Sequence, residues 1–373
     1  MLKKTPLHAA HQKLGARLVE FGGWEMPLYY SSILEEHRAV RSAAGIFDIS
    51  HMGEIDARGP RALEFVNFVL TNDARKLASG QGQYTLMCNE RGGTIDDLYL
   101  YRIDAEEYLM VVNASRTGAD FAWLERQRAA FPGRNGVELK NRSDELAAVA
   151  VQGPKAAGFI DNVFQPGAQT AAGLQKNEVV RLSFGGHVVF VSRTGYTGED
   201  GFEIITPAAC IEGIWNKLLE VGKSSGLKPA GLGARDTLRT EAGYPLYGHE
   251  LDEEISPLEA AVGIFVCLSK GEFIGRAALA QQKAAGTSRK LVGFKMDERT
   301  APPRPGYPIW RASGGTAPMG RVTSGVQSPS LGVGIGMGFV EPEFSPANTA
   351  VGIEVRGKRL AARVVSRPIY RRS

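Results

Sequence analysis

The sequence predicts an α+β protein that ends in a small antiparallel β-barrel. Up to about residue 285, segments with helical spacing of apolar residues are interspersed with segments that alternate apolar and polar side chains. After residues 284–290 the pattern changes to short strand-like segments separated by tight turns. Most of the 45 glycines stand in short runs between apolar segments, as turns require. We therefore expect a first region over residues 1–285 and a barrel over residues 286–373.

Helix and strand signals place the individual elements. The clearest helix covers residues 31–45, with Ser31 or Ser32 as the N-cap, acids in the first turn and Gly45 after the end. Residues 332–340 alternate glycine with apolar residues and are not followed by a helix, so we expect a closely packed strand rather than a nucleotide loop. Further helices are expected at 60–70, 119–130, 213–226, 233–243 and after residue 154, and strands at 47–59, 82–115 (as a three-strand meander) and 179–206.

Composition and missing motifs exclude several classes of protein. No apolar run is long enough to span a membrane, and the N-terminal residues lack the apolar core of a signal peptide. The net charge of +4 is too small and too dispersed to predict nucleic-acid binding. Phosphate-loop, HExxH and GxSxG motifs are absent. Cys88, Cys210 and Cys267 fit no metal or redox spacing, so we expect reduced core cysteines, no metal and a cytoplasmic location.

The stretch Gly92–Arg102, GGTIDDLYLYR, opens a strand-like segment with two adjacent acids. If this segment is extended, Asp97 shares a face with Tyr99 and Tyr101, whereas Asp96 lies on the leucine-bearing face expected to meet the core. We expect Asp96 to be a turn or capping residue. Burial among aromatic rings raises the pKa of a carboxyl group, so Asp97 is the candidate acid, although a structural role stays open.

Residues 192–204, SRTGYTGEDGFEI, combine a glycine-rich loop with an acid on a strand. Three glycines shape a tight loop that presents Tyr196 and leads to Glu203. In the strand, Glu203 lies on the face opposite Phe202 and Ile204. Its carboxylate can accept paired hydrogen bonds from an aminopyrimidine edge, or it can simply be a charged residue on a solvated face.

A helix-like segment over residues 233–243 carries two arginines four residues apart, Arg235 and Arg239, which share a helix face. Either they pair at the surface with Asp236 and Glu241, or Arg235 reaches the ligand that an acid such as Glu203 holds.

Two further features are ambiguous. His51 is the only histidine that stands beside motif-like residues, in SHMG, and a structural role is favoured for it. The C-terminal stretch VVSRPIYRRS is rich in arginine around Tyr370. It is either a solvated tail or a contact for an acidic ligand or partner.

Together these segments resemble the glycine cleavage T-protein family of aminomethyltransferases. The resemblance begins with TPLHAAHQKLGARLVEFGGWEMPLYY and continues, in the family's order and spacing, with FDISHMGE, TNDARKL, NERGGTIDDLYLYR, VVNAS, QGP, SRTGYTGEDGFEI, GARDTLRTEAGYPLYGHEL and VTSGVQSPSLG. Single pieces such as QGP are weak, but so many in order are not expected by chance. Departures such as Phe339 and Thr240 do not touch the proposed site.

The resemblance implies an α+β, three-domain ring around a central cavity that holds tetrahydrofolate. Two interleaved folate-binding domains would occupy residues 1–285, and the C-terminal antiparallel β-barrel would occupy residues 286–373. The implied partner is the lipoylated H-protein, which carries an aminomethyl group. Its methylene passes to tetrahydrofolate, the co-substrate, and gives 5,10-methylenetetrahydrofolate, ammonia and dihydrolipoyl H-protein.

Site residues follow from the resemblance position by position. Asp97 matches the family's key aspartate, which lies by the folate nitrogen between pterin and benzoyl ring and manages its proton during attack. Glu203 matches the residue that holds the pterin edge. The remaining matches are residues around the cavity, with the last one near its mouth: Met52, Tyr84, Tyr101, Asn113, Tyr196, Arg235 and Tyr370.

Relatives with the same fold leave an alternative function open. Sarcosine and dimethylglycine dehydrogenases carry an additional flavin domain, for which this chain has no fingerprint. Iron–sulfur assembly factors carry a cysteine in a region that here reads Arg193–Tyr196. A folate-dependent demethylase is not excluded by motifs, and a non-enzymatic folate-binding module is a third possibility.

Overall fold

The computed structural model describes residues 2–372, which form two compact units. The first unit contains residues 2–85 and 98–235, and the second contains residues 86–97 and 236–372. The chain leaves the first unit within strand β5 (Gln81–Cys88) and returns to it within strand β6 (Thr94–Asp104). The units are therefore interleaved in sequence, while the domain boundary near residue 285 stays a prediction.

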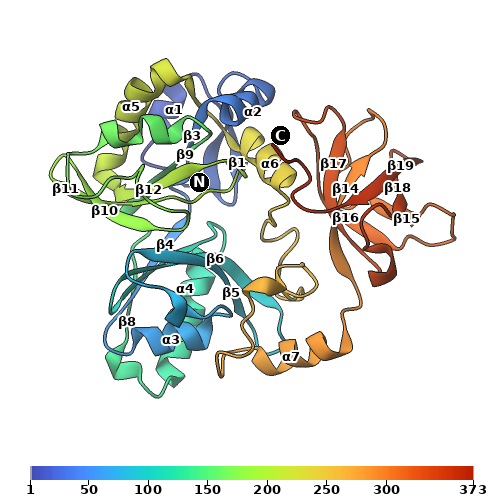
Figure 1. Ribbon diagram of the computed structural model, residues 1–373, viewed down its shortest axis with the longest axis horizontal. Coiled ribbons are helices and arrows are strands. Elements are labelled where there is room, and N and C mark those ends of the chain that lie inside the picture. Colours follow the sequence, from blue (N-terminus) through green and yellow to red (C-terminus); the bar gives the residue numbers. More distant parts are fainter. Residues whose placement is uncertain (1, 373) are drawn as a thin grey trace. The chain divides into compact units, whose positions relative to one another are not determined.

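A six-stranded sheet in the first unit has the order β10-β11-β12-β9-β3-β13 (Figure 1). Neighbouring strands run antiparallel, except that β13 is parallel to β3. Helix α5 (Ile211–Gly222) packs on this sheet through Ile214, Trp215 and Leu218, which are fully buried. The strands are β3 (Ala44–Asp48), β9 (Leu146–Gln152), β10 (Val179–Phe184), β11 (His187–Ser192), β12 (Gly201–Pro207) and β13 (Leu227–Pro229).

A second, five-stranded sheet has the order β5-β6-β7-β4-β8. Its remaining strands are β4 (Gly53–Arg58), β7 (Glu107–Val112) and β8 (Glu138–Asn141). The meander expected at 82–115 is thus confirmed as β5, β6 and β7. Helices α3 (Ala62–Val69) and α4 (Thr117–Ala130) pack on β4. A side chain at Gly53 would meet Thr117 of α4, so this position faces the helix. The next residue of β4, Glu54, lies on the opposite face of the strand.

Most other predicted helices are also present. Helix α2 (Ile33–Ser42) is capped by Ser32, whose hydroxyl accepts a hydrogen bond from the N–H of Glu35 at 3.2 Å. The remaining elements of the first unit are α1 (His8–Lys13), β1 (Arg17–Phe21), β2 (Trp24–Tyr29), η1 (Ala74–Lys76), η2 (Arg134–Gly136), η5 (Ala208–Cys210) and η6 (Lys223–Ser225), together with the first part of α6 (Leu232–Ala242).

Two local predictions were wrong. The segment 47–59 is not one strand, because Asp48 accepts a hydrogen bond from the N–H of Ser50 at 2.9 Å and the chain turns between β3 and β4. The helix expected after residue 154 is replaced by the short 3₁₀ helices η3 (Ala156–Gly158) and η4 (Ile160–Val163). Among the cysteines, Cys88 is buried as expected, whereas Cys210 and Cys267 are only half-buried.

The C-terminal barrel lies in the second unit and is closed, with the order β14-β17-β16-β15-β18-β19 (Figure 1). Its interior is filled by apolar side chains such as Phe294, Met296 and Ile353. The unit also holds the second part of α6, η7 (Gly263–Phe265), α7 (Arg276–Ala285) and η8 (Pro342–Phe344). The barrel strands are β14 (Lys290–Met296), β15 (Pro308–Arg311), β16 (Gly320–Gln327), β17 (Gly334–Val340), β18 (Ala350–Val355) and β19 (Lys358–Val365). Of the helices between residues 2 and 372, none is long and apolar enough to cross a membrane.

The alternating glycines of β17 lie where another strand or ring comes close. A Cβ atom at Gly336 would come within 2.5 Å of the Phe294 ring and would overlap the carbonyl oxygen of Ser324. The expectation of a strand without side chains on one face, packed closely against its neighbours, is therefore confirmed.

We expect Gly336→Ala to lower the free energy of unfolding of the barrel by about 1–3 kcal/mol, because its methyl group has no space. Gly352→Ala is the matched control in β18, where a Cβ would make ordinary contacts of 3.7–3.9 Å, and it should change stability by less than about 0.5 kcal/mol. Denaturation by urea would measure both. Equal effects of the two substitutions would contradict the close-packing argument.

Candidate functional site

The turn that precedes Asp97 is anchored within the second unit. Thr94 donates both its N–H (3.0 Å) and its hydroxyl (2.9 Å) to the carbonyl oxygen of Ile255. A side chain at Gly93 would overlap the carbonyl oxygen of Glu253, so only glycine allows this close approach. Gly92 adopts a positive φ of 86°, which favours glycine, so the first glycine serves the turn and the second serves packing. The start of β6 is thus fixed by a segment far along the chain.

The two acids of the motif differ in burial. Asp96 is fully buried, whereas Asp97 is partly buried, as is Tyr99 two residues later. This alternation matches the two faces expected for an extended strand. The interpretation of Asp96 as a turn residue was wrong, because it lies inside β6 rather than in the turn. The catalytic role of Asp97 stays a prediction.

Tyr101 of β6 contributes a buried phenol to the first unit. Its hydroxyl lies 3.0 Å from Ser192 Oγ and 2.9 Å from Thr194 Oγ1. Thr194 in turn donates to Glu203 Oε2 at 2.9 Å. The rings of Tyr99 and Tyr101 lie 5.0 Å apart. Burial, followed by the nearby Glu203 carboxylate, holds the pKa of Tyr101 well above its ordinary value, so this hydroxyl stays protonated and can donate.

Glu203 and Arg235 both belong to the first unit, and the charge of each affects the pKa of the other. Burial raises the pKa of Glu203, while the charge of Arg235 and the Thr194 hydrogen bond oppose this rise. The guanidinium of Arg235 lies over the ring of Tyr196, 4.8 Å from its centre. Arg235 Nη1 is buried and has no hydrogen-bond partner among residues 2–372. This site thus presents an acceptor, an aromatic face and an unsatisfied donor.

The structure places the remaining predicted site residues in both units. Tyr101, Tyr196, Glu203 and Arg235 come together in the first unit, as described above. The first unit also holds Met52 in the turn between β3 and β4, Tyr84 in β5 and Asn113 immediately after β7, each partly buried, whereas the second unit holds Asp97 and Tyr370.

Arg239, the other arginine of α6, pairs with side chains of the second unit. Arg239 donates to Asp236 at 2.6 Å, to Glu250 at 3.2 Å and to Ser324 at 2.9 Å. Arg239 is almost fully buried, and so is its partner Glu250, whereas Asp236 is half-exposed, so the pairing with Asp236 expected from the sequence is present and a second, interior ion pair adds to it. Glu241 accepts hydrogen bonds from serine side chains, including that of Ser330 at 2.8 Å. Arg239 therefore stabilises this part of the fold.

The C-terminal arginine-rich stretch is anchored to the second unit at Arg367 and Tyr370, while Arg371 and Arg372 are exposed. Arg367 donates to the carbonyl oxygen of Ala261 at 2.9 Å. The N–H groups of Ile369 and Tyr370 both donate to the carbonyl oxygen of Glu241, at 2.9 and 3.0 Å. Tyr370 is thus held in a defined position, while its role in ligand binding stays a prediction.

Sequence reasoning missed one buried acid and undervalued one histidine. Both carboxylate oxygens of Glu54 are buried without a partner among the described residues, and burial raises its pKa to about 8. His51 is 3% exposed and its Nδ1 likewise lacks a partner. Strand β4 also contains Asp56 and Arg58, so no pattern in the sequence singles out Glu54 as the unpartnered acid. For His51, no pattern in the sequence shows that its ring is buried.

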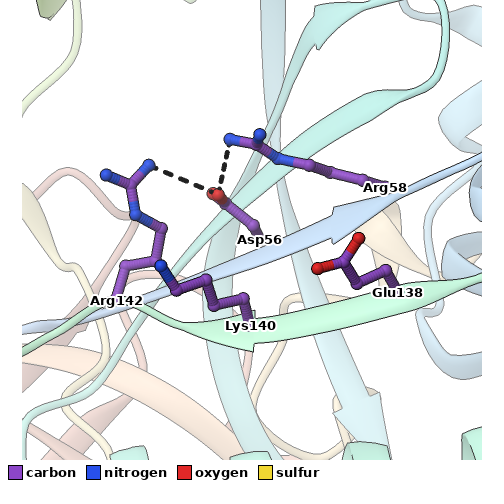
Figure 2. A pocket seen from close by; sticks show the side chains of 5 residues that line it. All are labelled: Asp56, Arg58, Glu138, Lys140 and Arg142. Carbon is purple, nitrogen blue, oxygen red and sulfur yellow. Dashed lines mark hydrogen bonds and ion pairs between the residues drawn. The ribbon is translucent and has the colours of Figure 1, made fainter.

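A separate pocket of about 280 Å³ is lined only by charged residues (Figure 2). Asp56 accepts from Arg58 at 2.7 Å and from Arg142 at 3.4 Å. The cations also have other partners, since Arg142 and Lys140 both pair with Glu145. Each cation that lines the pocket therefore already has a carboxylate partner within the protein. The lining residues are Asp56, Arg58, Glu138, Lys140 and Arg142, none of which is a predicted site residue.

Two family descriptions match most of the chain. The GCVT N-terminal domain family matches residues 7–270, and the glycine cleavage T-protein C-terminal barrel domain family matches residues 289–371. The chain belongs to the glycine cleavage T-protein family. The second match covers the closed barrel described above.

Individual relatives of this family match along almost their whole length. The chain is 50% identical to an aminomethyltransferase of Symbiobacterium thermophilum, over 99% of this chain and 98% of the relative. It is 48% identical to an aminomethyltransferase of Alkaliphilus oremlandii, over 100% of this chain and 98% of that relative. The crystal structure of the glycine cleavage system aminomethyltransferase T from Bartonella henselae matches with a TM-score of 0.91 and 37% identity, over 99% of this chain and 98% of that one. The predictions of an α+β fold, of this family and of an aminomethyltransferase are confirmed.

We expect Glu54→Gln to change how stability depends on pH. The pKa of Glu54 is raised from 4.5 to about 8, so between these values the unfolded chain releases its proton while the folded chain keeps it. The free energy of unfolding therefore falls as pH rises through this window, by up to about 1.4 kcal/mol per pH unit from this group. The glutamine variant loses that slope and gains stability relative to the native chain from about pH 5 to about pH 8.

Urea denaturation at several pH values would measure the difference. Glu138→Gln, which removes an exposed acid from the neighbouring strand β8, is the control and should leave the native slope in place. Parallel stability curves for Glu54→Gln and the native chain would show that Glu54 is not protonated in the folded state.

Proposed function

We propose that this aminomethyltransferase moves the methylene of an aminomethyl group from the lipoyl arm of H-protein to tetrahydrofolate. The carbon loses its bonds to sulfur and to the amino nitrogen and gains bonds to two folate nitrogens. The two hydrogens displaced from those nitrogens balance the reaction, one appearing on the released thiol and one on ammonia. The reaction is therefore a group transfer without net oxidation.

The observation that carries this proposal is the arrangement of Glu203, Arg235 and Tyr196. The amino group and ring N–H of a pterin are adjacent donors, and a carboxylate such as Glu203 is their natural acceptor. Arg235 offers a buried donor without a partner, and the ring of Tyr196 lies against its guanidinium. A flat heterocycle with donors and acceptors on its edge satisfies such a site, whereas a purely apolar ligand would leave these groups unpaired.

The role proposed for Asp97 concerns a proton. The folate nitrogen between pterin and benzoyl ring is weakly basic and must lose its proton as it attacks the aminomethyl carbon. A carboxylate held at the end of a rigidly anchored turn can position that nitrogen and accept the proton. The hydrogen bonds of Thr94 to Ile255 supply the rigidity on which this role depends.

The same fold leaves two competing functions that the assay must separate. A folate-dependent demethylase would act on a methylated small amine and would not need H-protein. A non-enzymatic folate-binding module would bind tetrahydrofolate without depending on Asp97. The test is an assay of the purified protein with aminomethylated H-protein and tetrahydrofolate. Absence of methylene transfer and ammonia release would contradict the proposal.

We expect Asp97→Asn to reduce turnover by about 10²–10⁴-fold while tetrahydrofolate still binds, because the amide cannot accept the proton. Asp96→Asn is the matched control on the adjacent, fully buried position, and it should mainly lower stability. Turnover numbers, folate affinity and melting temperature would be measured for both variants. The reverse pattern would show that the catalytic acid is Asp96.

We also expect the apparent affinity for H-protein to fall as salt rises, since the chain is mildly basic and an acidic partner would dock partly through charge. The Michaelis constant for H-protein, measured over a range of ionic strength at saturating tetrahydrofolate, tests this. A constant value would exclude electrostatic docking. Cytoplasmic location stays a prediction from the sequence.

A further inference from the structure

Gln152, the last residue of β9, is a fully buried polar side chain that the proposed reaction does not yet use. Its amide is hydrogen-bonded to the loop over residues 194–200. Nε2 donates to the carbonyl oxygen of Thr194 at 3.0 Å, and Oε1 accepts from the hydroxyl of Thr197 at 2.8 Å. A single side chain thus binds this loop on both sides of Tyr196.

The partners of the Gln152 amide fix its orientation. A carbonyl oxygen can only accept, so Nε2 must face Thr194, and its second hydrogen is donated to the carbonyl oxygen of Val151 at 3.3 Å. The hydroxyl of Thr197 accepts from the N–H of Glu199 at 3.2 Å and gives its own proton to Oε1 of Gln152. This position therefore requires a donor and an acceptor at the end of one side chain, which an amide supplies.

Two glycines make room for the amide. A Cβ atom at Gly195, or at Gly201 where β12 begins, would overlap the amide of Gln152 in its hydrogen-bonded position. The glycines that mark a tight loop in the sequence therefore allow the loop to close over this side chain. Arg41 of α2 holds the second half of the loop, because its Nη1 donates to the carbonyl oxygen of Thr197 at 2.9 Å.

The loop carries groups of the proposed folate site. Tyr196 lies between the two threonines that Gln152 binds, and its ring lies against the guanidinium of Arg235. Thr194, whose carbonyl oxygen accepts from Gln152, donates from its hydroxyl to Glu203 Oε2 at 2.9 Å. Tyr196 and Glu203 are both partly exposed, so a ligand can contact them although it cannot contact the enclosed Gln152.

We propose that Gln152 is a positioning residue for tetrahydrofolate, which holds Tyr196 and the hydrogen-bonded Glu203 in the arrangement that the ligand meets. This inference rests on the proposed use of tetrahydrofolate. Residues 194–200 form neither helix nor strand, so side-chain contacts fix them in place of a ladder. A loop that is ordered beforehand lowers the entropy lost on binding. Loss of the amide therefore weakens binding and spares the chemical step, since Asp97 lies on another strand.

Substitutions on both sides of the contact test this role. Gln152→Met keeps the length of the side chain and removes the amide, and Thr197→Val removes the hydroxyl that meets it. We expect each to raise the KM for tetrahydrofolate about tenfold, with kcat within about threefold of the native value. Because both remove the same contact, the double variant should resemble either single variant, and the two effects should not multiply.

Two further variants separate this effect from a general loss of stability. Thr197→Ser restores the hydroxyl, so its KM should lie within about threefold of the native value. Trp310→Phe removes a hydrogen bond of 2.8 Å from the indole Nε1 to Glu354 in the barrel. It should lower stability to urea and leave the KM for tetrahydrofolate unchanged, which shows that a weakened fold alone does not raise this constant.

Calorimetric affinity for tetrahydrofolate, measured without H-protein, separates the two levels of the argument. A native protein that binds tetrahydrofolate but transfers no methylene overturns the proposed function, while its affinity still tests Gln152. A merely structural role predicts that Gln152→Met is less stable but binds tetrahydrofolate with native affinity, and that result overturns the inference. So does a loss confined to kcat. If Gln152→Met does not fold, equal affinities of Thr197→Val and Thr197→Ser overturn it.

Discussion

The arrangement of the first unit depends on the hydrogen bonds that the Tyr101 hydroxyl makes with Ser192 and Thr194. Tyr101 belongs to the five-stranded sheet, while Ser192 and Glu203 belong to the six-stranded sheet. The Tyr101 hydroxyl is hydrogen-bonded to Ser192 and Thr194, and the Thr194 hydroxyl donates a hydrogen bond to Glu203. Because buried hydrogen bonds are directional and costly to leave unmade, this chain of contacts fixes the two sheets relative to each other and orients the Glu203 carboxylate.

Several ionisable groups of the first unit are buried in an otherwise apolar interior. Glu203, Arg235 and His51 are each shifted by burial toward their neutral forms. Such groups are expensive to bury unless a ligand or a partner satisfies them. The five-residue charged pocket shows the contrast, because there every cation already has a carboxylate partner. A pocket lined by charged residues is therefore not by itself evidence of a binding site in this protein.

Local patterns predicted the fold well where contacts are local. The Ser32 cap, the meander and the glycine-bearing strand of the barrel all follow from short-range spacing. The turn after Asp48 was missed because the apolar alternation of residues 47–49 resumes in the same phase at residues 55–57. The Asp48 carboxylate is fixed by Thr5 and His11, about forty residues away along the chain. The 3₁₀ helices after residue 154 were missed because a short apolar segment does not reveal its helix type.

The site was predictable in part. Strand alternation separated Asp96 from Asp97, and the family resemblance assigned roles that spacing left open. One alternative already had Arg235 reach the ligand that Glu203 holds, but the sequence could not decide it, since local spacing does not show how strand β12 and helix α6 lie in the fold. Glu54 and His51 were missed as unsatisfied groups because hydrogen-bond partners are a property of the folded chain and not of a motif.

The anchoring of Thr94 to Ile255 has a consequence for biosynthesis. The two residues are 161 positions apart, so the ribosome must add that many residues before the acceptor exists. At roughly 5–20 residues per second, the wait lasts about 8–32 seconds. During that interval the segment that carries Asp97 has been made, but its hydrogen bonds to Ile255 cannot form. The nascent chain can therefore fix its proposed catalytic acid only when translation is well past its midpoint.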